Sequence, residues 1–296
     1  PFRTDEEAIQ IANDTEYGLS AGVMTRDEGR GLAIVGKLDT GNCHINCSSV
    51  NDEPHVPFGG FKASGIGREA SLLFSEEGAS VCVADMSREA GEKTASECRE
   101  AFFQEVNVAD PGSVEAMYAA TAERYGGIDV LYNNAGISPD DDASVLDTSV
   151  EAWDRVQAVN TRGVFLCCKH GIPHLLERGG GSVINVASFV AILGAATSQI
   201  SYSASKGGVV GLTLPAARDL ARLGIRVCTI APGLFDTPLL AGLPEEARQA
   251  LGAQIPFPSR LGRPEEYATL ACHIAENTML NGETLRLDGA LRMPPR

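Results

Sequence analysis

From about residue 67 onward, short and continuously apolar runs alternate with segments of helical periodicity. Short runs of this kind are typical of strands that are buried on both faces. The alternation predicts an α/β fold, a doubly wound parallel sheet of the Rossmann-like type. The predicted strands are Ser80–Asp85, Phe103–Val108, Val130–Asn133, Ser182–Ala187, Arg226–Ala231 and Thr284–Leu287. The predicted helices are Arg68–Glu77, Arg88–Ala101, Gly112–Tyr125, Val150–Glu177, one through Tyr202 to about Leu223, and Pro264–Glu276.

The first residues of the chain do not follow this alternation. Thr4–Asn13 reads as a capped amphipathic helix, and the strand expected before the sheet domain, Asn51–Gly59, contains Pro54 and Pro57. Because proline cannot donate to a hydrogen-bonded ladder, this first strand is atypical. We therefore expect an appended segment over 1–56 and the sheet domain over 57–296.

Tyr202 and Lys206 are the strongest candidates for chemistry. They lie four residues apart, so on a helix they share one face, one turn from each other. An ammonium at that distance favours the phenolate, which predicts a lowered pKa for Tyr202 and a role as general acid and base. The alternative is a chance pair on a partly exposed helix.

Other polar groups follow predicted strands. Asn133 ends one strand, Ser188 comes directly after another, and Thr237 comes shortly after a third. Ligands bind outside the carboxyl ends of the strands in open α/β sheets. We therefore expect these side chains to meet at one edge.

The order of these motifs resembles the short-chain dehydrogenase/reductase family over roughly residues 64–296. The motifs are N-N-A-G at 133–136, Asn160, Ser188, Y-x-x-x-K at 202–206 and P-G-x-x-x-T at 232–237. The resemblance implies a hydride transfer between NAD(H) and an alcohol/ketone pair. Tyr202 would exchange the proton, Lys206 would bind the nicotinamide ribose, and Ser188 would polarise the carbonyl. Asn160 would hold a relay water.

The same resemblance implies a dinucleotide site. Gly65, Ile66 and Gly67 would open a helix whose free N–H groups bind pyrophosphate. Asp85, at the end of a predicted strand, can bind both ribose hydroxyls and repels a 2′-phosphate, which favours NAD over NADP. The remaining residues expected to bind the cofactor are Asn107, Val108, Asn133, Gly136, Pro232, Gly233 and Thr237, together with Tyr202 and Lys206.

The glycine-rich turn departs from the family pattern. Gly60 stands where the family has a threonine, and Phe61 where it has the first glycine. A phenylalanine is strained there if the turn needs a positive φ. With Pro54 and Pro57, this predicts weaker cofactor binding than in an intact family member, or a less stable fold.

Residues 1 to about 69 resemble the C-terminal part of the aldehyde dehydrogenase catalytic domain, through motifs such as Pro57–Gly65. The resemblance implies that the nucleophilic cysteine, the general-base glutamate and the nucleotide domain of that family would lie upstream of this piece. We therefore expect no aldehyde dehydrogenase chemistry from it. The chain looks like a chimera of the two families, joined at Ala63–Ala70, a short segment that fits the motifs of both. Segments such as Thr229–Phe235 and Pro256–Gly262 resemble the type-10 hydroxysteroid/3-hydroxyacyl-CoA dehydrogenases.

The composition of the chain restricts the kinds of partner and metal site that we expect. The net charge of −15 disfavours nucleic acids and anionic membrane surfaces. The eight cysteines contain no C-x-x-C pair and read as buried thiols in a reducing compartment. His170 and His174 are expected to lie on a helix that Pro173 interrupts, so no metal site is expected. With no export signal apparent, we expect a cytoplasmic protein, and the family resemblance implies a homodimer or homotetramer.

Three functions remain open from the sequence. The first is an NAD(H)-dependent oxidoreductase of secondary alcohols, with a 3-hydroxyacyl-CoA or hydroxysteroid substrate. The apolar stretch 234–258 would cover that substrate, or would simply pack as amphipathic helix. The second is a catalytically impaired or inactive chimera that binds without turnover. The third is an aldehyde dehydrogenase-related fusion, which the missing nucleophile disfavours.

Overall fold

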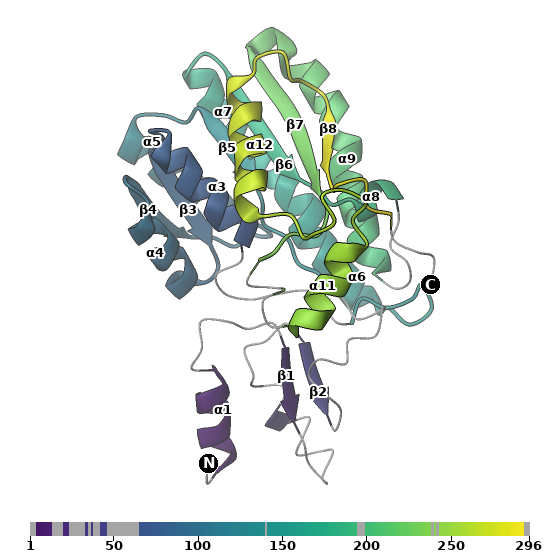
Figure 1. Cartoon of the computed structure of the whole chain (residues 1–296). Helices are drawn as coiled ribbons and strands as arrows, with labels where there is room; N and C mark the ends of the chain where they lie inside the picture. Colours follow the sequence, from purple (N-terminus) through teal and green to yellow (C-terminus); the bar gives the residue numbers. More distant parts are fainter. Residues whose placement is uncertain are drawn as a thin grey trace.

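The computed structural model describes residues 4–13, 20–23, 33–34, 37, 42–45, 65–139, 141–193, 199–237, 240 and 243–292 of the 296-residue chain (Figure 1). It confirms an α/β fold built on parallel strands. The predicted first strand, Asn51–Gly59, and the Gly60–Phe61 turn lie outside the described residues.

All strands of the sheet domain run parallel. β3 (Val81–Asp85) pairs with β4 (Ala101–Glu105), and β5 (Val130–Asn133), β6 (Gly181–Val186), β7 (Ile225–Pro232) and β8 (Thr284–Leu287) form a four-stranded sheet in that order. In both groups neighbouring strands end together: Asp85 faces Glu105, and Asn133 faces Asn185. The carboxyl ends therefore form an edge from which the functional loops leave.

Helices cover the strands on both faces, as Figure 1 shows. The helices of the sheet domain are α3 (Gly65–Glu76), α4 (Arg88–Glu97), α5 (Pro111–Tyr125), α6 (Val150–Gln157), α7 (Gly163–Glu177), α8 (Val190–Leu193), α9 (Ile200–Leu220), α11 (Glu245–Ala253) and α12 (Pro264–Glu276). A π-helical turn, η1 (Ala158–Arg162), joins α6 to α7, and a 3-10 turn, η2 (Ala221–Leu223), follows α9.

Two hydrophobic cores lie on opposite faces of the sheet. Val183 of β6 packs in one core with side chains of α5 and α7, whereas the next residue, Ile184, packs in the other with side chains of α12. This division follows from the alternation of side chains along a strand. Cys82 of β3 packs against the first core, so the two strand groups share it.

The structure corrects two predicted features. The strand predicted at Phe103–Val108 is β4, and it spans Ala101–Glu105. It ends earlier than predicted because Asn107 forms a turn in which its Oδ1 accepts from the N–H of Ala109 at 3.0 Å. Pro173 does not interrupt its helix, because α7 continues to Glu177. His170 and His174 therefore share one helix, yet the described residues hold no cluster of metal-ligating side chains.

The N-terminal residues contain the expected helix, α1 (Asp5–Asn13), and a parallel pair of short strands, β1 (Ser20–Val23) and β2 (Asn42–Ile45). No helix in the described portion of the chain has the length and apolarity required to cross a bilayer.

Truncation of Ile184 should destabilise the fold. Its side chain is fully buried between sheet and α12, so Ile184→Ala should lower the free energy of unfolding by about 2–5 kcal/mol. Val145→Ala, at a side chain that is 75% exposed, is the matched control and should change it by less than about 0.5 kcal/mol. Denaturant titration measures both, and similar losses for the two variants would contradict the assigned core.

Candidate active site

Helix α9 carries Tyr202 and Lys206 on one face. The Nζ of Lys206 lies 5.8 Å from the centroid of the Tyr202 ring, the separation expected for one helical turn. Lys206 is 3% exposed and donates a hydrogen bond of 2.8 Å to the backbone carbonyl of Val186, the last residue of β6. The helix and the carboxyl end of β6 are thus joined by this ammonium group.

Ser188 lies two residues after β6 and is buried. Its side chain lies beside the phenol of Tyr202, whose pKa it lowers. The N–H of Val190 donates to Oγ of Ser188 at 3.4 Å. The structure thus brings together a phenol, an alcohol and an amine from the end of β6 and from α9.

The pKa of Tyr202 does not follow the sequence-based expectation. Burial raises it above its ordinary value, and the hydrogen bond with Ser188 offsets only part of that rise. Burial also lowers the pKa of Lys206 to about 8. Both shifts have one cause, since desolvation penalises the charged form of either group. The prediction of a lowered pKa for Tyr202 is therefore wrong.

Asn160 lies in the π-helical turn η1 and is fully buried. Its Oδ1 accepts from the N–H of Ile137 at 2.7 Å, and its Nδ2 donates to the carbonyl of Ile137 at 2.8 Å and to Oγ of Ser205 at 3.0 Å. The side chain therefore ties the loop after β5 to α9. Such π-helical turns within α-helices are frequent at functional sites.

Gly136 allows this close assembly. A Cβ at this position would lie 3.1 Å from Nζ of Lys206 and 3.4 Å from Oδ1 of Asn160. Asn133, the last residue of β5, donates through Nδ2 to Oδ1 of Asn185 at 2.9 Å and so joins two central strands. Asn133 supports the site from the end of β5, and Gly136 supports it from the loop that follows.

An apolar cluster borders the phenol. Tyr202 packs against Phe189, Val190, Ile255 and Leu291, which are buried. These side chains come from the end of β6, the segment after α11 and the residues after β8. They account for the desolvation that raises the pKa of Tyr202.

The glycines at the start of α3 meet residues from distant loops. A Cβ at Gly65 would overlap the side chain of Thr237, and one at Gly67 would lie 2.6 Å from Nδ2 of Asn134. Gly65 is buried, and Ile66 packs against the α12 core. The sequence-predicted residues Gly65, Gly67 and Thr237 therefore lie together, at the N-terminus of a helix whose first N–H groups have no intrahelical partner.

Pro232 ends β7, and Gly233 follows it. The carbonyl of Pro232 accepts from the N–H of Phe189 at 3.0 Å, and Gly233 donates to Leu287 at 2.9 Å. A Cβ at Gly233 would lie 2.8 Å from the Cα of Asp288. These contacts fix the start of the loop that carries Thr237.

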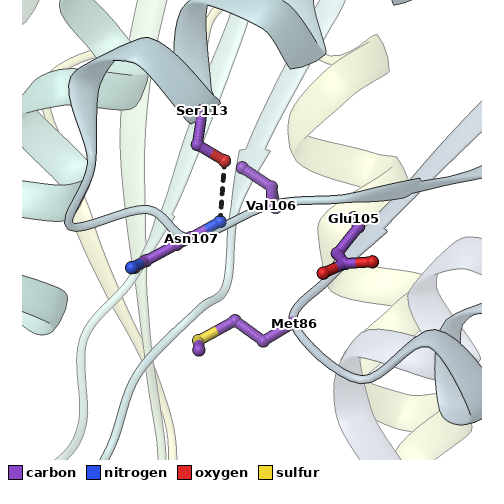
Figure 2. Close-up of a pocket in the computed structure, with 5 residues that line it drawn as sticks. All are labelled: Met86, Glu105, Val106, Asn107 and Ser113. Carbon is purple, nitrogen blue, oxygen red and sulfur yellow. Dashed lines mark hydrogen bonds between the residues drawn. The ribbon is translucent and has the colours of Figure 1, made fainter.

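A pocket lies at the carboxyl ends of β3 and β4 (Figure 2). It is lined by Met86, Glu105, Val106, Asn107 and Ser113. Asn107 donates from its backbone N–H to Oγ of Ser113 at 3.0 Å. The predicted residue Val108 lies beyond this pocket and packs where Gly163 leaves room at the start of α7.

Of the five residues that line this pocket, sequence reasoning identified only Asn107 and missed Met86, Glu105, Val106 and Ser113. Met86 is 68% exposed, directly after Asp85 at the end of β3. An exposed and polarizable side chain there suits the face of an aromatic ring. Its position next to the predicted ribose-binding carboxylate is the signal that could have identified it.

Charge at this pocket is mainly negative. Asp85 and Glu105 end neighbouring strands in register, and Asp85 accepts from the N–H of Ser87 at 2.8 Å. The nearby cation, Arg88, pairs with Glu92 at 3.1 Å and with Glu105 at 2.9 Å. These carboxylates are hydrogen-bond acceptors, and Met86 adds an apolar wall to the pocket, so hydroxyl groups and an apolar ring are the chemistry that the residues here could hold.

Comparison with known proteins gives two family matches. The family described as Enoyl-(Acyl carrier protein) reductase matches residues 59–291, and the Aldehyde dehydrogenase family matches residues 1–79. The two matches overlap over 59–79, and the predicted boundary between 56 and 57 stays a prediction. The second match agrees with the resemblance of the N-terminal residues.

Similar curated proteins cover the larger match almost completely. The 3-hydroxyacyl-CoA dehydrogenase type-2 of Bos taurus is 43% identical over 260 residues, which is 84% of this chain and 98% of the relative. The human protein of the same name has the same identity and coverage. The 3-oxoacyl-[acyl-carrier-protein] reductase FabG of Thermotoga maritima is 38% identical over 77% of this chain and 94% of the relative.

The buried amine should cost stability near neutral pH. The pKa of Lys206 is about 8 in the folded chain and 10.5 in the unfolded chain, so the unfolded chain binds more protons between these values and stability from this group rises with pH. Below pH 8 the penalty is complete. Lys206→Met removes this penalty and also loses the hydrogen bond to Val186, which offsets part of the gain. The net effect should be a free energy of unfolding at pH 7 that is higher by about 1–3 kcal/mol.

Denaturant titrations at pH 7 and pH 10 test this expectation. The advantage of Lys206→Met should shrink at pH 10, where the folded wild type already holds a neutral amine. Lys169→Met, on α7, serves as the control, because the Lys169 side chain is exposed and its replacement should not change stability in this pH-dependent way. A Lys206→Met variant less stable than wild type at pH 7 would mean that the bond to Val186 outweighs desolvation.

Proposed function

Since the chain belongs to the short-chain dehydrogenase/reductase family of oxidoreductases, we propose that it is an enzyme that interconverts a secondary alcohol and a ketone with NAD(H). One observation carries the proposal. The Tyr202 phenol, the Ser188 hydroxyl and the Lys206 amine lie together at the carboxyl ends of the strands, with Ser188 and Lys206 buried and Tyr202 partly buried. That edge is where such sheets bind ligands.

In this proposal the protein handles the proton. The nicotinamide, when bound, supplies or accepts the hydride. Ser188 donates a hydrogen bond to the ketone oxygen, and Tyr202 transfers its hydroxyl proton to that oxygen as the alcohol forms. In the oxidation direction Tyr202 takes the alcohol proton. The nearby Lys206, when protonated, stabilises the phenolate left behind.

Asn160 acts by position in this scheme. Its three hydrogen bonds hold the loop after β5 and Ser205 in place and use both N–H groups of the amide. The second lone pair of Oδ1 has no partner among these bonds, and we propose that it accepts from the relay water.

We propose NAD rather than NADP as the cofactor. Gly65, Gly67 and Thr237 would hold the pyrophosphate and the nicotinamide half, and the pocket of Figure 2 the adenine. Asp85 would bind the ribose hydroxyls. Glu105 beside it adds a second negative charge, and Arg88 is already paired with two carboxylates. A 2′-phosphate would meet repulsion without a free cation among these residues.

The proposed substrate is a 3-hydroxyacyl thioester such as a 3-hydroxyacyl-CoA, with a hydroxysteroid as the alternative. The names of the relatives support the first choice. The leucines after Thr237 do not decide this choice, because Leu240, Leu243 and Leu261 are buried in a small core of their own against α11. Arg248 of α11 pairs with Asp236 through two contacts of 2.7 Å, which attaches α11 to the loop bearing Thr237.

We also propose that the protein forms a homo-oligomer and resides in the cytoplasm. Phe165 of α7 is 56% exposed and Leu214 of α9 is 45% exposed, which supports pairing through the helices that flank the sheet. The six cysteines in the described residues are free thiols, consistent with a reducing cytoplasm. The alternative of impaired cofactor binding rests on residues 51–61, outside the described residues, and stays a prediction.

Removal of the Tyr202 hydroxyl should abolish most turnover. Tyr202→Phe should lower kcat for 3-hydroxyacyl-CoA oxidation by about 10²–10⁴-fold, because the proton acceptor is lost. The Kd for NADH should change by less than about tenfold. Tyr125→Phe, which removes a hydroxyl bonded to the carbonyl of Val81, is the control and should keep full activity. Undiminished turnover by Tyr202→Phe would remove the mechanism.

Cofactor choice should depend on Asp85. Asp85→Asn should lower the preference for NADH over NADPH, measured as a ratio of kcat/KM values, by at least about tenfold. Asp129→Asn, an exposed carboxylate paired with Arg178, removes the same charge elsewhere and should leave the ratio unchanged. Equal ratios for wild type and Asp85→Asn would assign the selection to another residue.

A further inference from the structure

Helix α9 begins without a local cap. Its N-cap residue, Gln199, has φ 57° and ψ 38°, and its side chain makes no capping hydrogen bond. A left-handed residue of this kind cannot offer the side-chain oxygen that usually accepts from the first turn. The N–H groups of Ser201 and Tyr202 therefore need an acceptor from elsewhere in the fold.

Asp142 supplies that acceptor from the loop after β5. Its Oδ1 accepts from the N–H of Ser201 at 2.8 Å, and its Oδ2 accepts from the N–H of Tyr202 at 2.7 Å. Its backbone carbonyl accepts from the N–H of Gln199 at 3.1 Å. Asp142 is fully buried, so three N–H groups at the start of α9, those of Gln199, Ser201 and Tyr202, depend on one residue.

A carboxylate is the appropriate group at this place. It has two oxygens for two parallel N–H donors, and its charge is favourable at a helix N-terminus. An amide could accept only one of these bonds, because its NH2 would face the second donor. Asp142 has no charged partner among the salt bridges of the described residues, which leaves the helix terminus to stabilise its charge.

The hydrogen bond from the N–H of Tyr202 to Asp142 fixes the position of the Tyr202 backbone. Its N–H is held by Asp142, and its carbonyl accepts from Oγ of Ser205 at 2.8 Å, a hydroxyl that also meets Asn160. The loop after β5 thus holds α9 twice, once through Ile137 and Asn160 and once through Asp142. Loss of the second attachment frees the turn that carries the phenol.

We propose that Asp142 is a positioning residue for Tyr202, which it places against Ser188 through the first turn of α9. The proposal rests on the function proposed above, in which the Tyr202 phenol exchanges the substrate proton. Asp142 itself touches neither the phenol nor the reacting atoms in this account.

Kinetics of Asp142→Asn and Asp142→Ala test the proposal. We expect kcat for 3-hydroxyacyl-CoA oxidation to fall about 10–100-fold with Asn and further with Ala, while KM for NAD changes less than about threefold. Asp141→Asn is the matched control, because this neighbouring carboxylate is exposed and pairs with Arg155 at 2.6 Å. Assays are run well below the melting temperature of each variant.

A second readout does not require turnover. In protein labelled with ¹³C at the tyrosine Cζ, the Tyr202 resonance, identified by its loss in Tyr202→Phe, should shift or broaden in Asp142→Asn and stay unchanged in Asp141→Asn. A lower melting temperature with wild-type kcat and an unmoved Tyr202 resonance would overturn the proposal and leave Asp142 a cap only. If wild type turns over no alcohol, the proposed function fails, and the Tyr202 resonance alone decides whether Asp142 positions the phenol.

Discussion

The site depends on a buried amine held beside a phenol at the end of a strand. Lys206 reaches the carbonyl of Val186, and this bond fixes α9 against β6 at the point where Ser188 leaves the sheet. An ammonium in this place has little water to solvate it, so its pKa falls to about 8. The amine is thus poised to change its charge near physiological pH, at a cost in stability that a functional site can carry.

The surrounding loops hold this pair from several directions. Asn160 ties the loop after β5 to α9, and Gly136 leaves the space that Lys206 needs. Asp142 caps the same helix from that loop. Each contact joins segments that are far apart in sequence, so the site forms only when the sheet and both neighbouring helices have assembled.

The edge proposed to bind the cofactor is also built from residues that are far apart in the sequence. Gly65 and Thr237 are in contact although they belong to opposite ends of the domain, and Asp85 and Glu105 meet through strand register. Arg88 is neutralised by two glutamates, so the pocket beside Met86 presents carboxylates and apolar surface. In the function that we propose, this edge binds a dinucleotide. The match of residues 1–79 to the Aldehyde dehydrogenase family distinguishes the N-terminal residues from the sheet domain.

Local pattern determined most of the architecture, because strand and helix periods are properties of neighbouring residues. Val130–Asn133, Pro264–Glu276 and Thr284–Leu287 were predicted with their observed bounds, and the four-residue spacing already placed Tyr202 and Lys206 on one face. Tertiary structure decided the rest. Burial reversed the expected pKa shift of Tyr202, and α7 ran through Pro173. Desolvation and the capping carboxylate of Asp142 come from segments distant in the chain, and no local pattern contains them.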